Sequence, residues 1–522
     1  MMKRSIAIRP GGLRVRRVFG VLTVAAVALA ACSTGDSALD TGSDNTSTES
    51  QPADGTDPAT SDSDTTDSGN APSTAGPTTT EAPLAEFPPC PVDALDGADG
   101  PVDITFWHGM VDEPEAALIA LTDAYNDSQD RVRVDLQGQT SYTSGMDKYV
   151  AASSSSRPTI IQLPDYALQQ FADSGTIIPT SACIEASGFD TDPILPRALG
   201  AYTLEGVLWG MPFNVSGPVL YYNRNMFTDA GLDPDDPPVS LEEWRDAAQA
   251  IVDSGASVNP VVLDSSPNAG GGWFIEQWFG RAGELYANNG NGRLARATEV
   301  LYDNDLGAEL MTFLQDMIND GLAMTVGDNA GGQDNFLKLV DPATPGAMTI
   351  GTSAAMGTAF QALGSGIAPG LTEDDFDVGP MPGPGLEPGV QVGGASLWIV
   401  ADKPDEQTAA AWDFVKYAVE AQTQSTWAAA TGYVPMRADA TELDPLAETY
   451  VADPRFRVAY DQVLSGSDDI TANAPALGPL RAVRAETARA TAAIFGGADV
   501  EATLADAVVA DNALIASYDE RN

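Results

Sequence analysis

The alternation of strand-like and helix-like segments after about residue 101 is the feature that most constrains the fold of this chain. Short runs rich in β-branched and aromatic residues are separated by stretches with apolar residues at helical spacing, such as Leu118, Leu121 and Tyr125. We predict strands at 102–107, 131–137, 159–163, 218–222, 348–350 and 396–401, and helices at 113–127, 241–254, 306–319 and 407–421. This pattern is typical of layered α/β folds.

The first 31 residues have the layout of a secretory signal peptide. They carry six basic residues and no acid, and end in an apolar run over 18–31. This run is shorter than the roughly 20 apolar residues that a membrane-spanning helix needs. Its end, Leu29-Ala30-Ala31-Cys32, is similar to a bacterial lipobox. The similarity implies that Cys32 receives lipid and tethers the mature protein to the outer face of the cytoplasmic membrane. In the alternative, an ordinary cleaved signal, Cys32 is incidental.

Residues 32–100 are predicted to form an acidic linker. Ser, Thr, Asp, Gly and Pro dominate 33–89, which contain eleven acids and no Lys or Arg. Such a segment buries too little apolar surface to offset the entropy lost on ordering. We expect a disordered, self-repelling stalk that lifts the folded body away from the anchor. The alternative is that this acidic tract binds a partner.

The composition argues against several classes of function. The 522 residues include 26 Lys and Arg against 74 Asp and Glu, and the formal charge of −48 opposes binding to nucleic acid. Without residues 1–31 the formal charge is −54. The single histidine, His108, and the two cysteines after Cys32 do not suffice for a zinc cluster, so we predict no metal and no cofactor. Outside the cytoplasm Cys90 and Cys183 can oxidise, so a disulfide between them is possible.

No motif indicates an enzyme. The chain contains no GxSxG, no Walker phosphate loop and no HExxH. An exported hydrolase remains an alternative, because the two carboxylates of a glycosidase need only meet in space. Aromatic and small polar residues instead follow or flank predicted strands, where they could approach or stack on a sugar or glycerol skeleton. These are Trp107-His108-Gly109, Tyr142, Asn214-Val215-Ser216-Gly217, Gly393-Gly394-Ala395-Ser396 and Gly432-Tyr433.

Five separated stretches carry a resemblance to a known family. They are ITFWHGM at 104–110, MPFNVSGPVLYYN at 211–223, AGLDP at 230–234, GGASLW at 393–398 and TGYVP at 431–435. They are similar to the extracellular solute-binding proteins of ABC importers, particularly members that bind glycerol-3-phosphate. The resemblance implies an α/β, two-lobed periplasmic-binding-protein-like fold (type II) that closes on its ligand by a hinge motion. We expect one lobe at 101–213 with 346–400 and the other at 214–345 with 401–522.

The resemblance also implies a set of ligand-binding residues. Asp165 falls where the family has a glutamate and would accept hydrogen bonds from glycerol or sugar hydroxyls. Arg484 lies at the family arginine that meets the phosphate, for which a planar, permanently charged guanidinium is suited. Alternatively, Arg484 is a surface arginine paired with Glu486, or Arg481 takes its place. The full set is Tyr142, Asp165, Ser216, Trp273, Thr352, Ser353, Gly394, Tyr433 and Arg484.

The sequence therefore predicts a monomeric, lipid-anchored binding protein on the extracytoplasmic face of the membrane, and not an enzyme. Its expected ligand is glycerol-3-phosphate or a glycerophosphodiester, and its expected partner is an ABC permease with a cytoplasmic ATPase. A neutral mono- or oligosaccharide is the alternative ligand, because relatives with this architecture bind sugars through aromatic walls. A purely structural surface lipoprotein is a further alternative.

Overall fold

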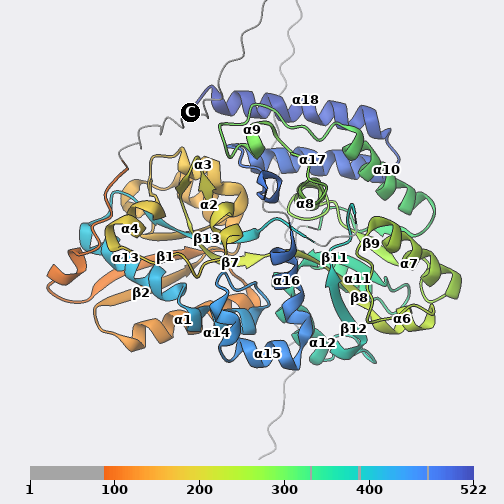
Figure 1. The fold of residues 1–522 in the computed structure, drawn as a ribbon, viewed down its shortest axis with the longest axis horizontal. Helices are drawn as coiled ribbons and strands as arrows, with labels where there is room; N and C mark the ends of the chain where they lie inside the picture. The colour runs from red at the N-terminus through yellow and green to blue at the C-terminus, as the bar shows by residue number, and fades with distance from the viewer. Residues whose placement is uncertain (1–86, 330–331, 386–388, 467–468) are drawn as a thin grey trace, which may run out of the picture. The chain divides into compact units, whose positions relative to one another are not determined.

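The computed structural model describes residues 87–329, 332–385, 389–466 and 469–522. The expected signal peptide, Cys32 and most of the expected linker lie outside the described residues. Two β-sheets organise the described part: β1 and β2 lie on the left of Figure 1, and β8 and β12 lie on the right. We call the part of the chain around each sheet the first lobe and the second lobe.

The sheet of the first lobe has the strand order β2-β1-β3-β13-β4, and β7 also pairs with β13. Strand β1 is parallel to β2 and β3, whereas β13 is antiparallel to β3, β4 and β7. The strands are β1 Val102–His108, β2 Val132–Gly138, β3 Ile160–Pro164, β4 Ile177–Ile178, β7 Met211–Ser216 and β13 Gly393–Val400. A short hairpin of β5 Thr203–Leu204 and β6 Val207–Leu208 stands apart from this sheet.

Helices cover both faces of the first sheet. Neighbouring residues of each strand point to opposite sides of the sheet, so the two faces pack against different helices. Phe106 of β1 contacts Phe414 of α13, whereas the next residue, Trp107, lies 3.9 Å from the Lys148 ammonium of α2. The helices of this lobe are α1 Asp112–Ser128, α2 Tyr142–Ala151, α3 Leu168–Ala172, α4 Thr180–Ser187, α5 Pro196–Ala201, α13 Asp405–Ala418 and α14 Ala421–Thr431.

The sheet of the second lobe has the strand order β10-β9-β11-β8-β12. Its strands are β8 Pro218–Asn223, β9 Val261–Leu263, β10 Ala323–Thr325, β11 Met348–Thr352 and β12 Phe376–Pro380. Helices α6 Arg224–Asp229, α7 Leu241–Ser254, α8 Trp273–Arg281, α9 Asn288–Asn291, α10 Asp305–Asn319, α11 Asp334–Leu339 and α12 Met356–Gly364 follow in chain order. The chain ends with α15 Leu446–Ala452, α16 Val458–Ser465, α17 Leu480–Phe495 and α18 Val500–Asp519.

Local sequence signals account for several of these boundaries. Helix α7 has the predicted bounds, because Ser240 and Glu243 form a capping box at its start and Gly255 adopts a left-handed conformation after its end. The predicted helix 113–127 is α1, in which Pro114 occupies the first turn. The other predicted strands and helices are also present, with ends that differ by a few residues.

The expected assignment of segments to lobes is wrong in two places. The segment 346–400 was expected in the first lobe, but β11 and β12 pair with β8 and belong to the second sheet. The segment 401–522 was expected wholly in the second lobe, but α13 packs on β1 and β13, and α14 packs on α1. Strand pairing between distant segments decides lobe membership, and a propensity pattern does not reveal it.

Two connecting segments run side by side at the junction of the lobes. Strand β7 leads through Gly217 into β8 of the second sheet, and the chain returns from the second lobe into β13. Near this junction Gly393 and Gly394 pair with Ser216 and Val215. Gly394 has a φ of 97°, and a Cβ at this position would lie 2.0 Å from the Asn214 carbonyl oxygen. Only glycine therefore allows this close approach.

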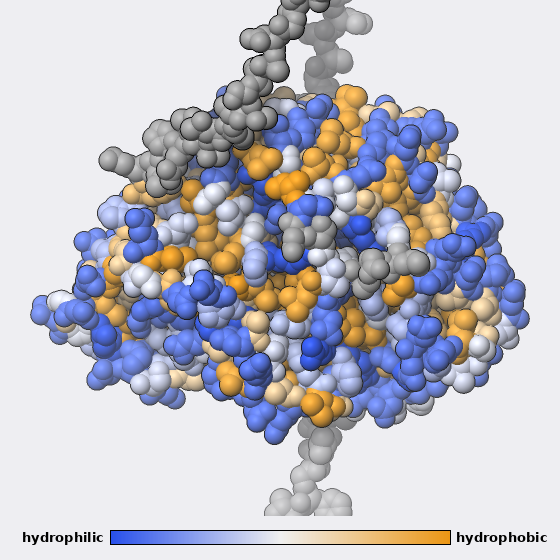
Figure 2. Space-filling model, viewed as in Figure 1, coloured by the Kyte–Doolittle hydropathy of each residue, from blue (hydrophilic) through white to orange (hydrophobic). Residues whose placement is uncertain are grey.

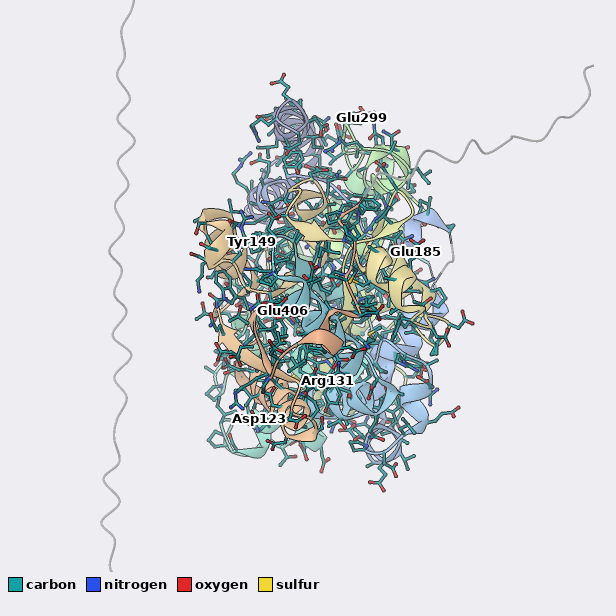
Figure 3. All side chains as sticks on the ribbon, turned by 90° about the vertical axis from the view of Figure 1, so that its left-hand side faces the viewer. Asp123, Arg131, Tyr149, Glu185, Glu299 and Glu406 are labelled. Carbon is teal, nitrogen blue, oxygen red and sulfur yellow. A yellow bond between two sulfur atoms is a disulfide. The ribbon has the colours of Figure 1, made fainter. Side chains whose placement is uncertain are left out.

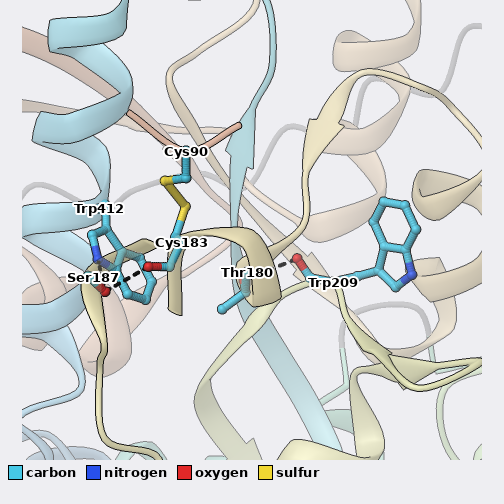
Figure 4. Close-up of a disulfide and its surroundings, with 6 residues drawn as sticks. All are labelled: Cys90, Thr180, Cys183, Ser187, Trp209 and Trp412. Atoms are coloured by element: carbon cyan, nitrogen blue, oxygen red, sulfur yellow. Dashed lines mark hydrogen bonds between the residues drawn. A yellow bond between two sulfur atoms is a disulfide. The ribbon is translucent and has the colours of Figure 1, made fainter. Parts of the chain in front are cut away.

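Residues 87–100, which were assigned to the linker, belong to the folded body. A disulfide joins Cys90 to Cys183 of α4, next to the Trp412 indole that donates a hydrogen bond to Ser187 (Figure 4). Leu95, in the 3₁₀ helix Ala94–Gly97, is buried, and this helix packs against α13. The low-complexity composition ends before this segment. Leu95 anchors the segment by apolar packing, and the disulfide anchors it covalently.

Acidic side chains are distributed over the exterior. Asp123, Glu185 and Glu406 are exposed on the face shown in Figure 3. Hydrophilic residues predominate on the flanks of the face in Figure 2, and apolar residues gather toward its middle. The acids of the described residues are therefore mainly water-exposed. Buried ionic side chains are few among the residues that the structure describes.

One buried acid lies between the C-terminal helices and the rest of the second lobe. Asp511 of α18 is fully buried, and it accepts a hydrogen bond of 2.6 Å from the Tyr302 hydroxyl. Its Oδ1 has no hydrogen-bond partner among the described residues. Burial raises the pKa of Asp511 to about 7, although the Tyr302 hydrogen bond opposes the rise.

Removing the disulfide should destabilise the first lobe. A Cys90→Ser/Cys183→Ser variant should unfold with a free energy about 3 kcal/mol lower, because the cross-link restricts a long loop in the unfolded chain. Chemical denaturation of both proteins measures this difference. A reductant should lower the stability of the wild type and leave the variant unchanged. Equal stability of the oxidised wild type and the variant would contradict the prediction.

Stability should fall with rising pH through Asp511. The pKa of this acid is higher in the folded state than in the unfolded chain, so between about pH 4 and pH 7 only the folded state holds its proton. The free energy of unfolding should therefore decrease over this interval, by up to about 4 kcal/mol from this residue. The Asp511→Asn variant should lack this pH-dependent contribution. Its free energy of unfolding, measured relative to that of the wild type, should therefore increase with pH. Parallel pH profiles in thermal unfolding would refute the assignment.

Candidate functional site

A cavity of about 660 Å³ lies between the lobes. The first lobe contributes the segment from Gly109 to Pro114 and Tyr142, and the second lobe contributes residues of β8, α11, β11 and α12. Tyr221, Phe336 and Phe360 give it aromatic walls. The described residues of its lining include the carboxylates Asp112 and Glu113 and no Lys or Arg. The cavity is therefore largely apolar, with acids at one side.

Hydrogen bonds fix one tyrosine of the cavity lining. Tyr142 begins α2, and its hydroxyl accepts a bond of 2.9 Å from the Asn214 amide. Asn214 accepts a bond of 2.8 Å from Gln162, which accepts one from the Gly109 amide. Burial raises the pKa of Tyr142, and the adjacent Tyr433 contributes to the rise. Tyr142 therefore stays protonated and can donate a hydrogen bond.

A buried ionic cluster joins the lobes elsewhere at their junction. Arg484 of α17 is 2% exposed, and its Nε and Nη2 each donate a bond of 2.7 Å to the carboxylate of Glu276 in α8. Nη2 also bonds Asp165 of the first lobe, at 2.8 Å. Nη1 has a longer contact of 3.4 Å with Asn268. One guanidinium thus bridges a carboxylate of its own lobe and one of the opposite lobe.

The charges in this cluster stabilise the ionised states of Arg484 and Glu276. Burial alone would lower the pKa of Arg484, but Asp165 and Glu276 outweigh it and raise that pKa. Burial raises the pKa of Glu276, and the Arg484 charge opposes the rise. When both acids are ionised, the three groups carry a formal charge of −1. Arg484 therefore remains cationic.

Two buried polar groups beside the cluster lack hydrogen-bond partners among the described residues. One is the hydroxyl of Tyr202, a fully buried side chain. Burial raises the pKa of Tyr202, and the nearby Asp165 and Tyr433 raise it further. The other is the indole N–H of Trp273. Its neighbour Gly272 faces Arg484, since a Cβ on Gly272 would lie 3.2 Å from the arginine side chain. Both groups could serve a hydroxylated ligand.

The structure divides the expected site residues into groups. Tyr142, Thr352 and Tyr433 line the cavity, whereas Asp165 and Arg484 form the interlobe ion pair. Trp273 is buried against Gly393. Ser216 and Gly394 lie in the connecting segments, and the buried Ser353 hydroxyl accepts a 3.4 Å bond from the Gly217 amide.

The positions of Arg484 and Arg481 also decide between the alternatives that the sequence left open for Arg484. Arg484 does not pair with Glu486, whose partner is Arg489. Arg481 reaches Asp147 of the first lobe at 2.6 Å, but its side chain is 46% exposed. Arg481 therefore lies at the rim of the interface, and Arg484 lies inside it.

Sequence reasoning missed Glu276 and Tyr202. Glu276 is the one acid in the run from Trp273 to Phe279, where every other residue except Gln277 is apolar or aromatic, and an acid buried in such a run needs a partner. Tyr202 lies at the end of α5 and has no distinctive local signal. Its position beside Asp165 arises only from the fold.

Comparison with known proteins places this architecture in a family. Residues 120–458 match the family described as bacterial extracellular solute-binding protein. The chain belongs to this family. Its members act outside the cytoplasm, bind small molecules and work with ABC permeases, so this chain is the solute-binding protein of an ABC transporter. The predicted family and the two-lobed fold are confirmed.

Individual relatives of this solute-binding protein differ in what they bind. The sn-glycerol-3-phosphate-binding periplasmic protein UgpB of Brucella melitensis is 26% identical, over 80% of this chain and 93% of that protein. UgpB of Mycobacterium tuberculosis in complex with glycerophosphocholine has a TM-score of 0.65 and 20% identity, over 80% of this chain and 99% of that one. The cyclic α-maltosyl-1,6-maltose binding protein of Arthrobacter globiformis has a TM-score of 0.64 and 23% identity, with the same coverages. These structural similarities support the fold.

No helix in the described part of this solute-binding protein combines the length and apolar character needed to cross a bilayer.

Replacing the central arginine should destabilise the fold. Arg484→Ala leaves Glu276 and Asp165 buried without their cation, so the free energy of unfolding should fall by about 3–5 kcal/mol. Arg481→Ala is the matched control: it removes an exposed ion pair between the same lobes and should change stability by at most about 1 kcal/mol. Denaturant titration of both variants tests this. Equal losses would contradict the assignment of the interior cluster.

Proposed function

We propose that this solute-binding protein captures a glycerophosphodiester, or glycerol-3-phosphate itself, between its lobes and delivers it to an ABC permease. The observation that carries the proposal is the inward-facing guanidinium of Arg484, which is bonded to a carboxylate of each lobe. A ligand phosphate oxygen would replace Asp165 on Nη2 when the lobes close around it. Asp165 would then accept hydrogen bonds from the glycerol hydroxyls.

The net charge of the chain does not oppose this binding. Exposed charges are screened beyond about 8 Å at physiological salt, whereas Arg484 would act at contact distance in a medium of lower dielectric. The guanidinium also matches a phosphate in geometry, because two N–H groups can donate in parallel. Tyr202 and Trp273 would supply further hydrogen bonds to the ligand. The relatives named for glycerol-3-phosphate and glycerophosphocholine support this ligand class.

The apolar cavity would hold the group esterified to the phosphate. Its aromatic walls suit an alkyl or quaternary ammonium group, and Asp112 and Glu113 would favour a positive charge there. A phosphodiester would place its anion near Arg484, and its head group would extend toward the cavity, whose lining residue Tyr433 interacts electrostatically with Tyr202 beside the cluster. Free glycerol-3-phosphate would leave this cavity unfilled.

A neutral saccharide is the second candidate ligand. It is favoured by the lining of the cavity, whose described residues include no basic side chain. It is also favoured by Arg484, whose charge is already balanced by carboxylates. The cyclic α-maltosyl-1,6-maltose binding protein shares the fold. Aromatic walls and Tyr142 would then contact sugar rings and hydroxyls.

The remaining parts of the proposal concern the cell surface. Cys32 would carry the lipid after removal of residues 1–31, and the acidic linker would give the lobes reach above the membrane. The protein would act as a monomer and without a cofactor. It would release its ligand chemically unaltered, since its relatives are named as binding proteins and not as enzymes.

Calorimetric titration of the folded body decides between the ligands. Glycerophosphocholine and glycerophosphoglycerol should bind, and maltose should not. Arg484→Lys should weaken phosphodiester binding at least tenfold, because an ammonium cannot donate two parallel bonds. Arg481→Lys is the control and should bind as the wild type does.

Binding of maltose alone would overturn the phosphate proposal and support the saccharide. If none of these compounds produces a binding heat or a thermal shift, the protein is instead a purely structural lipoprotein. Mass spectrometry of the recovered ligand should find it intact, and cleavage products would indicate a hydrolase.

A further inference from the structure

We infer that Glu276 determines the charge of the ligand that Arg484 accepts, so that a singly charged phosphodiester is preferred over a doubly charged phosphate monoester. The inference rests on the proposed function and specifies its ligand class. It assigns a specificity role to a residue that was absent from the expected site.

Glu276 and Arg484 form the permanent half of the ionic cluster. Both belong to the second lobe, and Glu276 is 0% exposed. Both of its carboxylate oxygens accept hydrogen bonds of 2.7 Å from the guanidinium. Separation of the lobes would leave this pair intact, because neither partner belongs to the first lobe. Glu276 therefore orients the guanidinium before a ligand arrives.

Asp165 forms the exchangeable half. It reaches Nη2 at 2.8 Å from the opposite lobe, next to Nη1, whose contact with Asn268 is the longer one at 3.4 Å. The edge formed by Nη1 and Nη2 is thus the part of Arg484 that an incoming anion can reach. An anionic oxygen in the place of Asp165 would take over this hydrogen bond from Nη2, while Asp165 turns to the glycerol hydroxyls and keeps its negative charge in the site.

The charge balance then limits the ligand. With Glu276 ionised, the Glu276–Arg484 pair is neutral, so it offers hydrogen bonds but no net positive charge. A phosphodiester carries a single negative charge, whereas a monoester carries about −1.5 to −2 at neutral pH. The additional charge of the monoester would be desolvated without compensation, and this is costly in a protein interior.

Arg293 supplies no hydrogen bond for a second negative charge on the ligand. It lies close enough to Asp165 for that acid to raise its pKa, but burial lowers the pKa of Arg293 to about 10. Its N–H groups donate to the backbone carbonyls of Ala474, Ala201 and Thr203. Arg293 therefore provides a fixed background charge, and its hydrogen-bond donors are already used.

The test compares two ligands that share the glycerol phosphate group. Glycerol-3-phosphate is the monoester, and glycerophosphoglycerol is a diester without an ammonium group. The wild type should bind the diester more tightly at pH 7.5. Glu276→Gln keeps the size of the side chain and one acceptor oxygen, and leaves the Arg484 charge uncompensated. This variant should shift the ratio of the two dissociation constants at least tenfold toward the monoester.

Glu486→Gln is the matched control, because Glu486 lies on the same helix as Arg484 but pairs with Arg489. It should leave the ratio unchanged. An unchanged ratio in Glu276→Gln would overturn the inference while the proposed function stands. Should that variant fail to fold, tighter binding of the monoester by the wild type would overturn the inference by itself. Absence of binding of either anion by the wild type would instead refute the proposed function, and the inference with it.

Discussion

The contact of one buried guanidinium with carboxylates from both lobes is the interaction on which the arrangement of the site depends. Removing ions from water is costly, and their attraction in the interior returns little more than that cost. The main consequence of the cluster is therefore positional. Glu276 holds the Arg484 guanidinium in one orientation, and Asp165 determines where the first lobe meets it. A cation in this position is accessible to a ligand only if the lobes separate.

The connecting segments place the other polar residues around the same junction. Strands β7 and β13 pair side by side, so Asn214, Ser216 and Gly394 come together from distant parts of the chain. Asn214 then orients Tyr142 in the lining of the cavity. The segments that link the lobes thus also form part of the wall between them. Movement of the lobes would necessarily alter the ligand contacts.

The electrostatics of this protein act on two length scales. The formal charge of the chain is −48, and the acids of the described residues are largely exposed, where they favour solubility and are screened by salt. In the interior, by contrast, the electrostatic balance depends on individual charged groups. In the proposed function, one arginine, two carboxylates and the two acids of the cavity lining would limit which charges a ligand can carry. A net charge calculated from composition contains no information about this balance.

Much of the secondary structure could be predicted from the sequence. Helix α7 follows from its capping box and apolar spacing, and strand β1 follows from the residues 102–107. These signals are local, because capping and side-chain periodicity involve residues a few positions apart. The family motifs likewise indicated a two-lobed binding protein, since they preserve the order of several short segments. Arg484 could be named from such a motif.

Only the tertiary structure decided how these segments combine. The lobe to which β11, β12 and α13 belong depends on pairing and packing with partners more than a hundred residues away in the chain. The same is true of Glu276, which acquires its significance from Asp165 and Arg484, and the position of Tyr202 beside Asp165 likewise arises only from the fold. The sequence determined the local elements and pointed to Arg484 through a family motif. The fold determined which carboxylates surround that arginine, because burial and distance between remote residues exist only after the chain has folded.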